Sequence, residues 1–272
     1  MKRSIWCVLL VLAASSGAGA APLPLWEAGV IGGVVSTPAY PGAAERSNRA
    51  LALPFLIYRG EVFRSDQSGI NARLLRSDTF ELDVGFAASL PARSDAGAAR
   101  AGMPDLGTLL ELGPRLKINL ARLTPTSRLR FDLPLRAVFE ARHGMRNQGY
   151  TFEPKLVYEV RDASGRWNGD AYIGAVLGDR KINGYFYDVL PQYARADRPA
   201  YEADAGLMLA RVGLSASRLV NDDLRLFGFV RYESYASAAN RDSPLMKRST
   251  GSSAGIGVAW TLGRSKRLAA GN

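Results

Sequence analysis

Residues 127–142, SRLRFDLPLRAVFEAR, alternate between two kinds of side chain. One parity is apolar throughout, whereas the other carries charges except at Pro134 and Val138. A period of two is that of a β-strand with one apolar and one polar face. In a soluble sheet the apolar face turns toward a protein core, whereas in a membrane barrel it turns toward lipid and the charges turn toward the lumen.

The same alternation recurs at residues 79–90, 109–121, 151–160, 224–233 and 253–262. Most of these segments keep phase for about 10–14 residues, whereas soluble strands usually run about 5–6 and tilted membrane strands need about 9–11. No segment shows a sustained helical period, so no second layer is left over to cover the apolar faces. We therefore predict an all-β, transmembrane, antiparallel up-and-down β-barrel.

The connections between these segments alternate in length. Short turns are expected at 59–60, 77–78, 123–127, 162–166 and 221–222, and longer segments at 36–47, 91–107, 143–148, 180–200 and 237–251. Outer-membrane barrels have short periplasmic turns and long extracellular loops. If 61–66 and 69–76 are two short strands joined by a tight external turn, the barrel has about 12 strands and both termini in the periplasm. If 61–76 is a bent excursion instead, it has about ten.

The N-terminus reads as an export signal. Met1-Lys2-Arg3 precedes a short apolar run and the small residues Ala18-Gly19-Ala20, the pattern of a cleaved signal peptide over residues 1–20. We expect the barrel to occupy 21–263 and a basic periplasmic tail to occupy 264–272. Cys7 would leave with the signal, so the mature chain would have no cysteine for disulfide or thiol chemistry.

The mature chain would be basic. Without Lys2 and Arg3, 33 of the 35 Lys and Arg remain against 25 Asp and Glu, so the net charge falls from +10 to +8. This balance suits lipopolysaccharide phosphates and lipid head groups, or it is simply a solvated basic surface. Because the chain carries an export signal, we do not expect nucleic acid as a partner.

The charged parity of the strands would face the lumen. There the charges would cross-pair and plug a barrel of about 12 strands, or leave an ion-selective pore. Aromatic residues near strand ends would sit at the membrane interfaces, unless they merely reflect the preference of aromatics for strands. The expected lumen-facing charges are Glu81, Asp83, Glu111, Arg115, Lys117, Arg130, Asp132, Arg136, Glu153, Lys155 and Arg231, and the expected interfacial aromatics are Trp26, Tyr58, Trp167, Tyr232 and Trp260.

Four segments carry a resemblance to a known family. They are PAYPGAAERSNRALALPFLIYRGEVFRSD, GMPDLGTLLELGPRLKINL, GDRKINGYFYDV and DSPLMKRSTGSSAGIGVAWTL. In order and spacing the chain resembles the MipA/OmpV family of Gram-negative outer-membrane proteins over roughly 26–262. The resemblance implies an outer-membrane scaffold that joins a lytic transglycosylase to a peptidoglycan synthase, and another branch of the family is linked to adhesion. Barrels of this kind usually end on an aromatic residue, whereas this chain continues past Trp260-Thr261-Leu262 as GRSKRLAAGN.

We find no catalytic site, metal-ligand spacing or cofactor motif in the sequence. The single histidine, His143, lies in a predicted loop without an evident catalytic neighbour, so a solvated role is expected. Two loop segments are candidate interaction sites. Gly102, Met103, Pro104 and Asp105 would constrict the lumen, make an external contact or simply form a turn; Tyr185, Phe186 and Tyr187 would form an exposed binding patch or pack over the barrel mouth.

The sequence thus predicts a non-enzymatic outer-membrane barrel. By resemblance it is a scaffold for peptidoglycan synthesis and remodelling enzymes, holding two partners at high effective concentration. The alternatives are a small-solute channel and a surface adhesin. The RSKR segment at 264–267 would touch acidic groups in the periplasm or stay a disordered tail.

Overall fold

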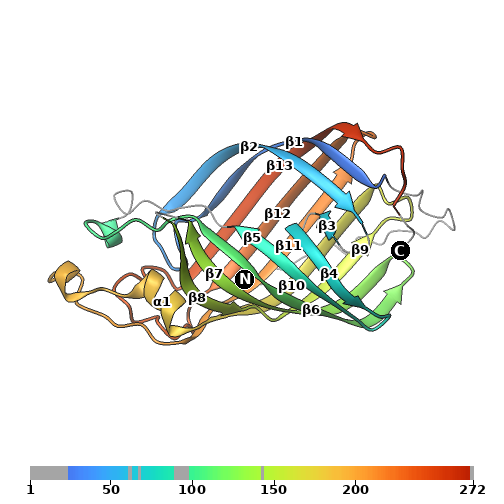
Figure 1. Ribbon diagram of the computed structural model, residues 1–272. Helices are drawn as coiled ribbons and strands as arrows, with labels where there is room; N and C mark the ends of the chain where they lie inside the picture. The colour runs from blue at the N-terminus through green and yellow to red at the C-terminus, as the bar shows by residue number, and fades with distance from the viewer. Residues whose placement is uncertain (1–23, 61–62, 67–68, 89–97, 142–143, 270–272) are drawn as a thin grey trace, which may run out of the picture.

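The computed structural model describes residues 24–60, 63–66, 69–88, 98–141 and 144–269. One antiparallel sheet closes on itself through the pairing of β10 with β11 and of β13 with β1, as Figure 1 shows. The strands are β1 Trp26–Pro38, β2 Arg46–Arg59, β3 Phe63–Asp66, β4 Gly69–Arg76, β5 Phe80–Ala88, β6 Leu109–Thr124, β7 Ser127–Ala141, β8 Met145–Phe152, β9 Lys155–Arg161, β10 Trp167–Gly178, β11 Gly206–Leu219, β12 Leu224–Ser234 and β13 Thr250–Arg264.

The predicted strand number of 12 is confirmed for the described residues, because β8 and β9 are two halves of one strand. Both halves pair with β7 on one side and with β10 on the other. The break falls at Glu153 and Pro154, since proline has no amide hydrogen to donate to a ladder. The short strands predicted at 61–66 and 69–76 are present as β3 and β4, so the ten-strand alternative is wrong.

The strands follow the predicted period of two. Outward positions carry large apolar side chains that are well exposed, such as Ile173 at 60%, Ile256 at 66% and Leu262 at 64%. The opposite parity carries buried charged groups such as Asp83 and Asp132. This reversal of the usual soluble pattern is that of a barrel wall facing lipid, and the apolar belt is the arrangement found in outer-membrane barrels.

The two ends of the barrel differ in their connections. At the turn end the chain enters β1, leaves β13, and makes short connections that include residue 60 and 77–79, 125–126, 162–166 and 220–223. At the loop end lie, among the described residues, 39–45, 98–108, 144, 179–205 and 235–249. The predicted loop at 143–148 is wrong in extent, because β8 already begins at Met145 and pairs with β7 through Ala141.

The segment after β13 runs beside the start of the chain. Arg264, predicted to open the tail, is the last residue of β13. Beyond it, the Ser265 amide donates to the Trp26 carbonyl at 2.9 Å, and the Leu25 amide donates to the Arg267 carbonyl at 2.8 Å. The basic segment 264–267 is therefore held at the turn end by backbone hydrogen bonds.

The loop end carries the described helices. α1 spans Arg180–Tyr187, and short 3₁₀ turns span Ala98–Arg100 and Pro191–Tyr193. Asp179 caps α1 by accepting a hydrogen bond from the Ile182 amide at 2.9 Å, which satisfies one of the free amides of the first turn. Gly149 on β8 has a φ of 108° and leaves room for this cap, since a Cβ there would lie 2.8 Å from the Ile182 nitrogen. None of the helices in the described ranges is long and apolar enough to cross a bilayer.

Candidate functional site

Among the described residues, the most deeply buried ion pair of the barrel joins β5 and β6. Asp83 accepts two hydrogen bonds from the Arg115 guanidinium, at 3.0 and 2.7 Å, and both side chains are almost fully buried. Lys117 lies 2.8 Å from both Asp83 and Glu81. Arg73 on β4 completes the group, 2.8 Å from Glu81. A two-pronged guanidinium–carboxylate pair of this kind fixes the register of its strands as well as their charge balance.

A second group of charges lies on β7 and the broken strand beside it. Arg130 pairs with Asp132 at 2.7 Å and with Glu159, which also pairs with Arg128. Lys155 lies near Asp132 in register and its ammonium is 5.7 Å from the centre of the Tyr172 ring. Lys155 thus lies between a carboxylate and an aromatic face.

The third group reaches across strands that are not neighbours. Arg136 lies 3.2 Å from Glu111 and 3.2 Å from Glu153. Glu153 also pairs with Arg211 of β11, although β10 separates the two in the sheet. An ion pair that skips a strand runs over the inner surface of the wall. On β12, Arg231 pairs with Glu233 at 2.9 Å.

All eleven charges that the sequence assigns to the lumen lie on the inward parity. Ten of them belong to these three groups, and Arg231 forms a separate pair with Glu233. Only part of each group was predicted from the sequence. The partners that were left out lie on the charged parity of their own strands, three of them within the alternating segments and two, Arg73 and Arg211, outside these segments. The parity is the signal that could have found them. They are Arg73, Arg128, Glu159, Arg211 and Glu233.

A folded cap covers the loop end of the barrel. It is built from the connections 39–45, 98–108, 179–205 and 235–249, which share one cluster of buried apolar residues: Tyr40, Ala43, Ala99, Leu106, Val189 and Leu245. A second cluster joins α1 to the inner wall, where Ile182 and Tyr187 pack with Val138 of β7 and Met208 of β11. Figure 1 shows α1 at this end of the barrel. We call these four connections the loop-end cap.

The cap is held by polar contacts between segments far apart in the sequence. Arg198 is buried and donates to the carbonyls of Ala99 and Ala101 at 2.9 and 3.0 Å. Asn240 donates to Asn183 at 3.0 Å and to the Asp204 carbonyl at 2.9 Å. Buried side chains that are satisfied in this way favour one arrangement of the cap over others.

The structure of the cap decides between the exposed and the packed arrangement of Tyr185, Phe186 and Tyr187. Tyr187, proposed as part of an exposed interaction loop, is fully buried and donates to the Pro41 carbonyl at 3.2 Å. Tyr185 and Phe186 are partly buried against both apolar clusters. An exposed aromatic patch at 185–187 is therefore wrong, and the alternative of packing over the barrel mouth holds. The sequence did not reveal this because the exposed and packed arrangements have the same composition.

Burial shifts the ionisation of the cap tyrosines. It raises the pKa of Tyr40 to about 12, although Arg100, 5.8 Å from the ring centre, partly opposes this. Burial, followed by the nearby Glu140 carboxylate, raises the pKa of Tyr185 above the ordinary value of 10.0. Burial likewise raises the pKa of Tyr187 well above 10.0. These phenols stay neutral at any physiological pH and act as hydrogen-bond donors.

The segment Gly102–Asp105 forms a turn at the edge of the cap. The Met103 amide donates to the Arg100 carbonyl at 2.9 Å, and Gly102 takes a φ of 78°, which favours glycine. Met103 packs against the first apolar cluster, and the Pro104 carbonyl accepts from Arg100 at 3.2 Å. This segment is therefore a turn within the cap.

The five aromatic residues assigned to the interfaces lie toward strand ends. Trp26 and Tyr58 face each other across β1 and β2 at the turn end, with exposures of 38% and 37%. Trp167 opens β10, and its ring lies against Gly169. Trp260 is paired with Leu224, the first residue of β12, whereas Tyr232 lies near the other end of that strand. They therefore occupy both ends of the apolar belt.

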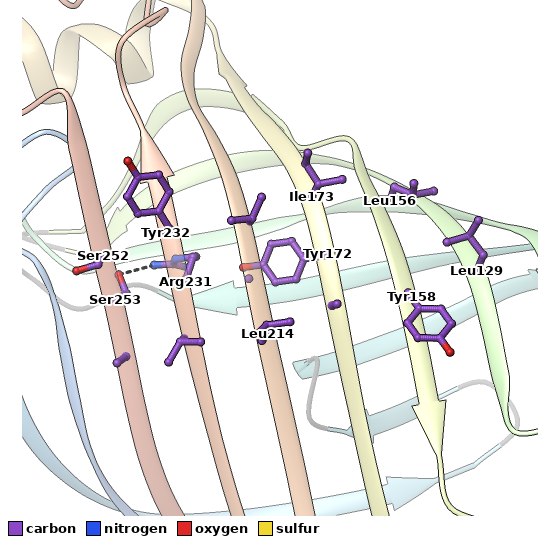
Figure 2. A pocket seen from close by; sticks show the side chains of 15 residues that line it. Leu129, Leu156, Tyr158, Tyr172, Ile173, Leu214, Arg231, Tyr232, Ser252 and Ser253 are labelled. Atoms are coloured by element: carbon purple, nitrogen blue, oxygen red, sulfur yellow. Dashed lines mark hydrogen bonds between the residues drawn. The ribbon is translucent and has the colours of Figure 1, made fainter. Parts of the chain in front are cut away.

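A shallow apolar groove of about 700 Å³ runs across the barrel wall from β7, over β9, β10, β11 and β12, to β13. Figure 2 shows its lining, in which Tyr158, Ile173 and Leu214 are among the exposed apolar side chains of the belt. Arg231 lies behind them and donates to the Ser253 hydroxyl at 3.3 Å. A groove with this mostly apolar lining suits hydrocarbon.

No group of three or more potential metal ligands occurs within the residues that the structure describes. His143 lies outside those residues. Ten of the eleven inward charges named above are engaged in ion pairs, and these groups do not form a nucleophile–base arrangement of the kind that hydrolases use.

Comparisons with known proteins give several solved structures that this chain resembles in part. A search of curated proteins gives no match. Among solved structures, an outer membrane channel from Pseudomonas putida F1 is 13% identical, with a TM-score of 0.38 over 92% of this chain and 100% of that chain. Outer membrane phospholipase A from Escherichia coli is 11% identical, with a TM-score of 0.34 over 88% of this chain and 94% of that chain.

The family comparison covers nearly all of the barrel. The model of the family described as MltA-interacting protein MipA matches residues 30–262, from β1 to the end of the apolar belt on β13. The chain therefore belongs to the MltA-interacting protein MipA family.

Proposed function

We propose that this barrel is a non-enzymatic scaffold in the outer membrane that holds cell-wall enzymes at its periplasmic rim. The observation that carries the proposal is the family match, because the family is described as interacting with MltA. A lytic transglycosylase is accordingly the first partner, and a peptidoglycan synthase is the second by resemblance. Two enzymes bound to one barrel act at raised effective concentration toward each other.

The orientation follows from the two ends of the barrel. Both ends of the described chain and the short turns lie at the turn end, which in outer-membrane barrels is periplasmic. The loop-end cap then faces outward, toward lipopolysaccharide. An N-terminal signal peptide over residues 1–20 would bring the chain to this membrane and be removed.

The turn end offers a charged surface to a periplasmic partner. Several exposed basic residues lie on this rim. An acidic patch on a partner enzyme would be attracted to such a rim, with an on-rate that falls as salt rises. The exposed basic residues are Arg122, Arg166, Arg218, Lys266 and Arg267.

Co-purification from native envelopes tests the proposal. A tagged barrel should recover a lytic transglycosylase, and the triple variant Arg122→Glu, Arg166→Glu, Lys266→Glu should recover at least about fivefold less, because opposite charges at the rim are replaced by like charges. A matched control makes the same charge change at the loop end, with Lys181→Glu, Arg195→Glu and Arg241→Glu, and should recover as much as the parent. Absence of any cell-wall enzyme from the parent pull-down would overturn the scaffold role.

A further inference from the structure

Arg46 is an outward-facing cation at the boundary of the apolar belt. It opens β2 at the loop end, and its side chain is exposed. Below it, the outward side chains of three neighbouring strands change from polar to apolar. The residues on the two sides of this change are Ser36 and Val34 on β1, Asn48 and Ala50 on β2, and Ser252 and Ala254 on β13. A cation just outside this boundary lies at the level of the lipid head groups.

Hydroxyl groups, and not carboxylates, hold the Arg46 guanidinium. Its Nε and Nη2 atoms donate to the Ser36 hydroxyl at 3.1 and 2.9 Å, and Nη1 donates to the Ser252 hydroxyl at 3.5 Å, across β1. The Ser36 hydroxyl donates in turn to the Asn48 side-chain oxygen at 2.6 Å. A guanidinium has five N–H groups, so one on each terminal nitrogen remains for a ligand. The barrel wall therefore positions this charge without neutralising it.

Two further cations lie beside Arg46. The Lys247 and Arg248 amides donate to the Gly42 carbonyl at 2.8 and 3.0 Å, which holds this segment against the connection that leads into β2. Both side chains are exposed. We call Arg46, Lys247 and Arg248 the rim cations.

The rim cations differ from three other exposed arginines of the loop-end cap, each of which has a carboxylate partner. These pairs are Arg180 with Glu202, Arg195 with Asp197 and Arg241 with Asp242. Within the part of the chain that the structure describes, no carboxylate forms an ion pair with a rim cation. Glu45, next to Arg46 in the chain, lies near the Tyr40 phenol inside the cap. The rim therefore carries three uncompensated positive charges.

The apolar groove begins at the same place. Ser252, whose hydroxyl accepts from Arg46, also lines the groove that Figure 2 shows. From Ser252 the lining continues through Tyr232, Val212 and Ile173, which lie in register on β12, β11 and β10 and are 51%, 45% and 60% exposed. A cationic rim and a hydrocarbon groove therefore meet at one residue.

We propose that the rim cations and this groove bind one lipopolysaccharide molecule, with a lipid A phosphate on the rim cations and an acyl chain in the groove. Lipid A joins phosphate groups to several acyl chains, so it matches both halves of the site. Guanidinium groups bind phosphate through paired, charge-assisted hydrogen bonds. Lipid tails are as apolar as the barrel wall, so the phosphate supplies the selectivity and the groove orients the chain. The proposal rests on the outward orientation of the loop end given above and needs no periplasmic partner.

Native mass spectrometry of the purified full-length barrel, titrated with phosphorylated lipid A, tests the proposal. The variant that replaces all three rim cations should bind lipid A at least about tenfold more weakly, because charge-assisted hydrogen bonds to phosphate are lost. This variant is Arg46→Gln, Lys247→Gln, Arg248→Gln.

The matched control removes the same charge from the same end of the barrel, at the three arginines that have carboxylate partners. It should bind lipid A as tightly as the parent. Equal weakening by the two triple variants would overturn the site. The control variant is Arg180→Gln, Arg195→Gln, Arg241→Gln.

The groove is tested by a second pair of variants. Val212→Trp fills the groove and should weaken lipid A binding at least about threefold, because the acyl chain loses its contacts with the wall. Val258→Trp, at a similarly exposed position on β13 outside the groove, should leave binding unchanged. Equal effects of the two tryptophans would contradict a bound acyl chain.

Two further ligands separate lipid A from other sources of phosphate or hydrocarbon. Dephosphorylated lipid A and phosphatidylglycerol should each bind at least about tenfold more weakly than phosphorylated lipid A, since one lacks the phosphate and the other lacks the sugar head group that carries it. Equal binding of either ligand would overturn the assignment to lipid A. No cell-wall enzyme takes part in this measurement, so a negative result here leaves the scaffold proposal standing.

Discussion

Asp83 shows how an inward charge differs from a surface one. Its carboxylate and the Arg115 guanidinium are both almost fully buried and share two hydrogen bonds. Removing one member of a buried pair leaves the other charge uncompensated. The main effect of the Asp83–Arg115 pair on stability is therefore the cost of breaking it, because the loss of either residue leaves the other charge buried without its partner.

Asp83→Ala should lower the free energy of unfolding by about 3–5 kcal/mol, because Arg115 loses its principal partner in a buried site. Urea unfolding in phospholipid vesicles, followed by tryptophan fluorescence, measures this. The matched control is Asp223→Ala, whose partner Arg264 forms an exposed pair at the turn end, and which should change stability by less than about 1 kcal/mol. Equal effects of the two substitutions would contradict the role assigned to burial. The double variant Asp83→Ala, Arg115→Met should recover part of the loss.

The cap tyrosines predict a response to alkaline pH. Burial raises the pKa of Tyr40 to about 12, whereas the phenol of an unfolded chain has a pKa of about 10. A neutral form favoured by folding stabilises the cap fully below pH 10, and this contribution is lost as the pH rises toward 12. The absorbance of phenolate at 295 nm should show that Tyr40→Phe removes a component titrating near pH 12. Loss of a component near pH 10 would mean that the cap does not bury this ring.

At the scale of the strand, aromatic rings cover glycines across neighbouring strands. Phe227 lies opposite Gly257, Phe229 opposite Gly255, and Tyr172 opposite Gly213. Each ring occupies the space where a Cβ on the glycine would sit. Such pairs cover backbone on the inner wall and fix strand register, as designed sheets also show.

Gly257→Ala should destabilise the barrel by about 1–3 kcal/mol, because the added methyl group displaces the Phe227 ring and crowds a neighbouring strand. The new Cβ would also lie 2.7 Å from the Gly32 carbonyl oxygen. Gly32→Ala on β1 is the control, since the nearest atom to its Cβ is 3.9 Å away. The shift in unfolding midpoint on unheated gels should appear only for Gly257→Ala. A similar shift for both would assign the effect to glycine itself rather than to the ring.

The strands were predictable from sequence because they obey a local rule. Period-two alternation located β5, β6, β7, β12 and β13 to within a few residues. The break between β8 and β9 was missed, since 151–160 keeps its alternation through Pro154 and only pairing with two neighbours reveals the interruption. Arg211, the partner of Glu153, was also missed, because register across a closed barrel is not a local property.

The cap was the least predictable part of the molecule. Its residues have no period, and the contacts that decide their burial join positions as distant as Tyr40 and Leu245, whose hydroxyl and carbonyl lie 2.8 Å apart. Composition alone therefore left Tyr185, Phe186 and Tyr187 between an exposed patch and a packed one. The helix α1 depends on Asp179 and on the space above Gly149, two features that only the folded barrel brings together.

At the scale of the whole molecule, two obstructions lie along the barrel axis. The loop-end cap covers one mouth, and the ion-paired groups of Arg136, Glu153 and Arg211 line the wall below it. Barrels of 16–18 strands leave an aqueous channel and barrels of about 8 are filled by side chains. With 12 strands, closure depends on the cap and on the paired charges together.

The two obstructions predict the electrical behaviour of the barrel. In planar bilayers the unsubstituted protein should give no stable conductance steps, whereas replacing residues 181–202 with a short Gly-Ser linker should give small steps, because this removes α1 from the mouth while the inner ion pairs remain. Adding Glu153→Ala to that deletion should enlarge the steps and favour anions, since Arg136 and Arg211 then lack a shared counter-charge. Lys181→Gln alone, which changes an exposed charge and leaves the cap in place, should stay silent. Large steps from the unsubstituted protein would show that the lumen is open, and the channel alternative would then replace the scaffold.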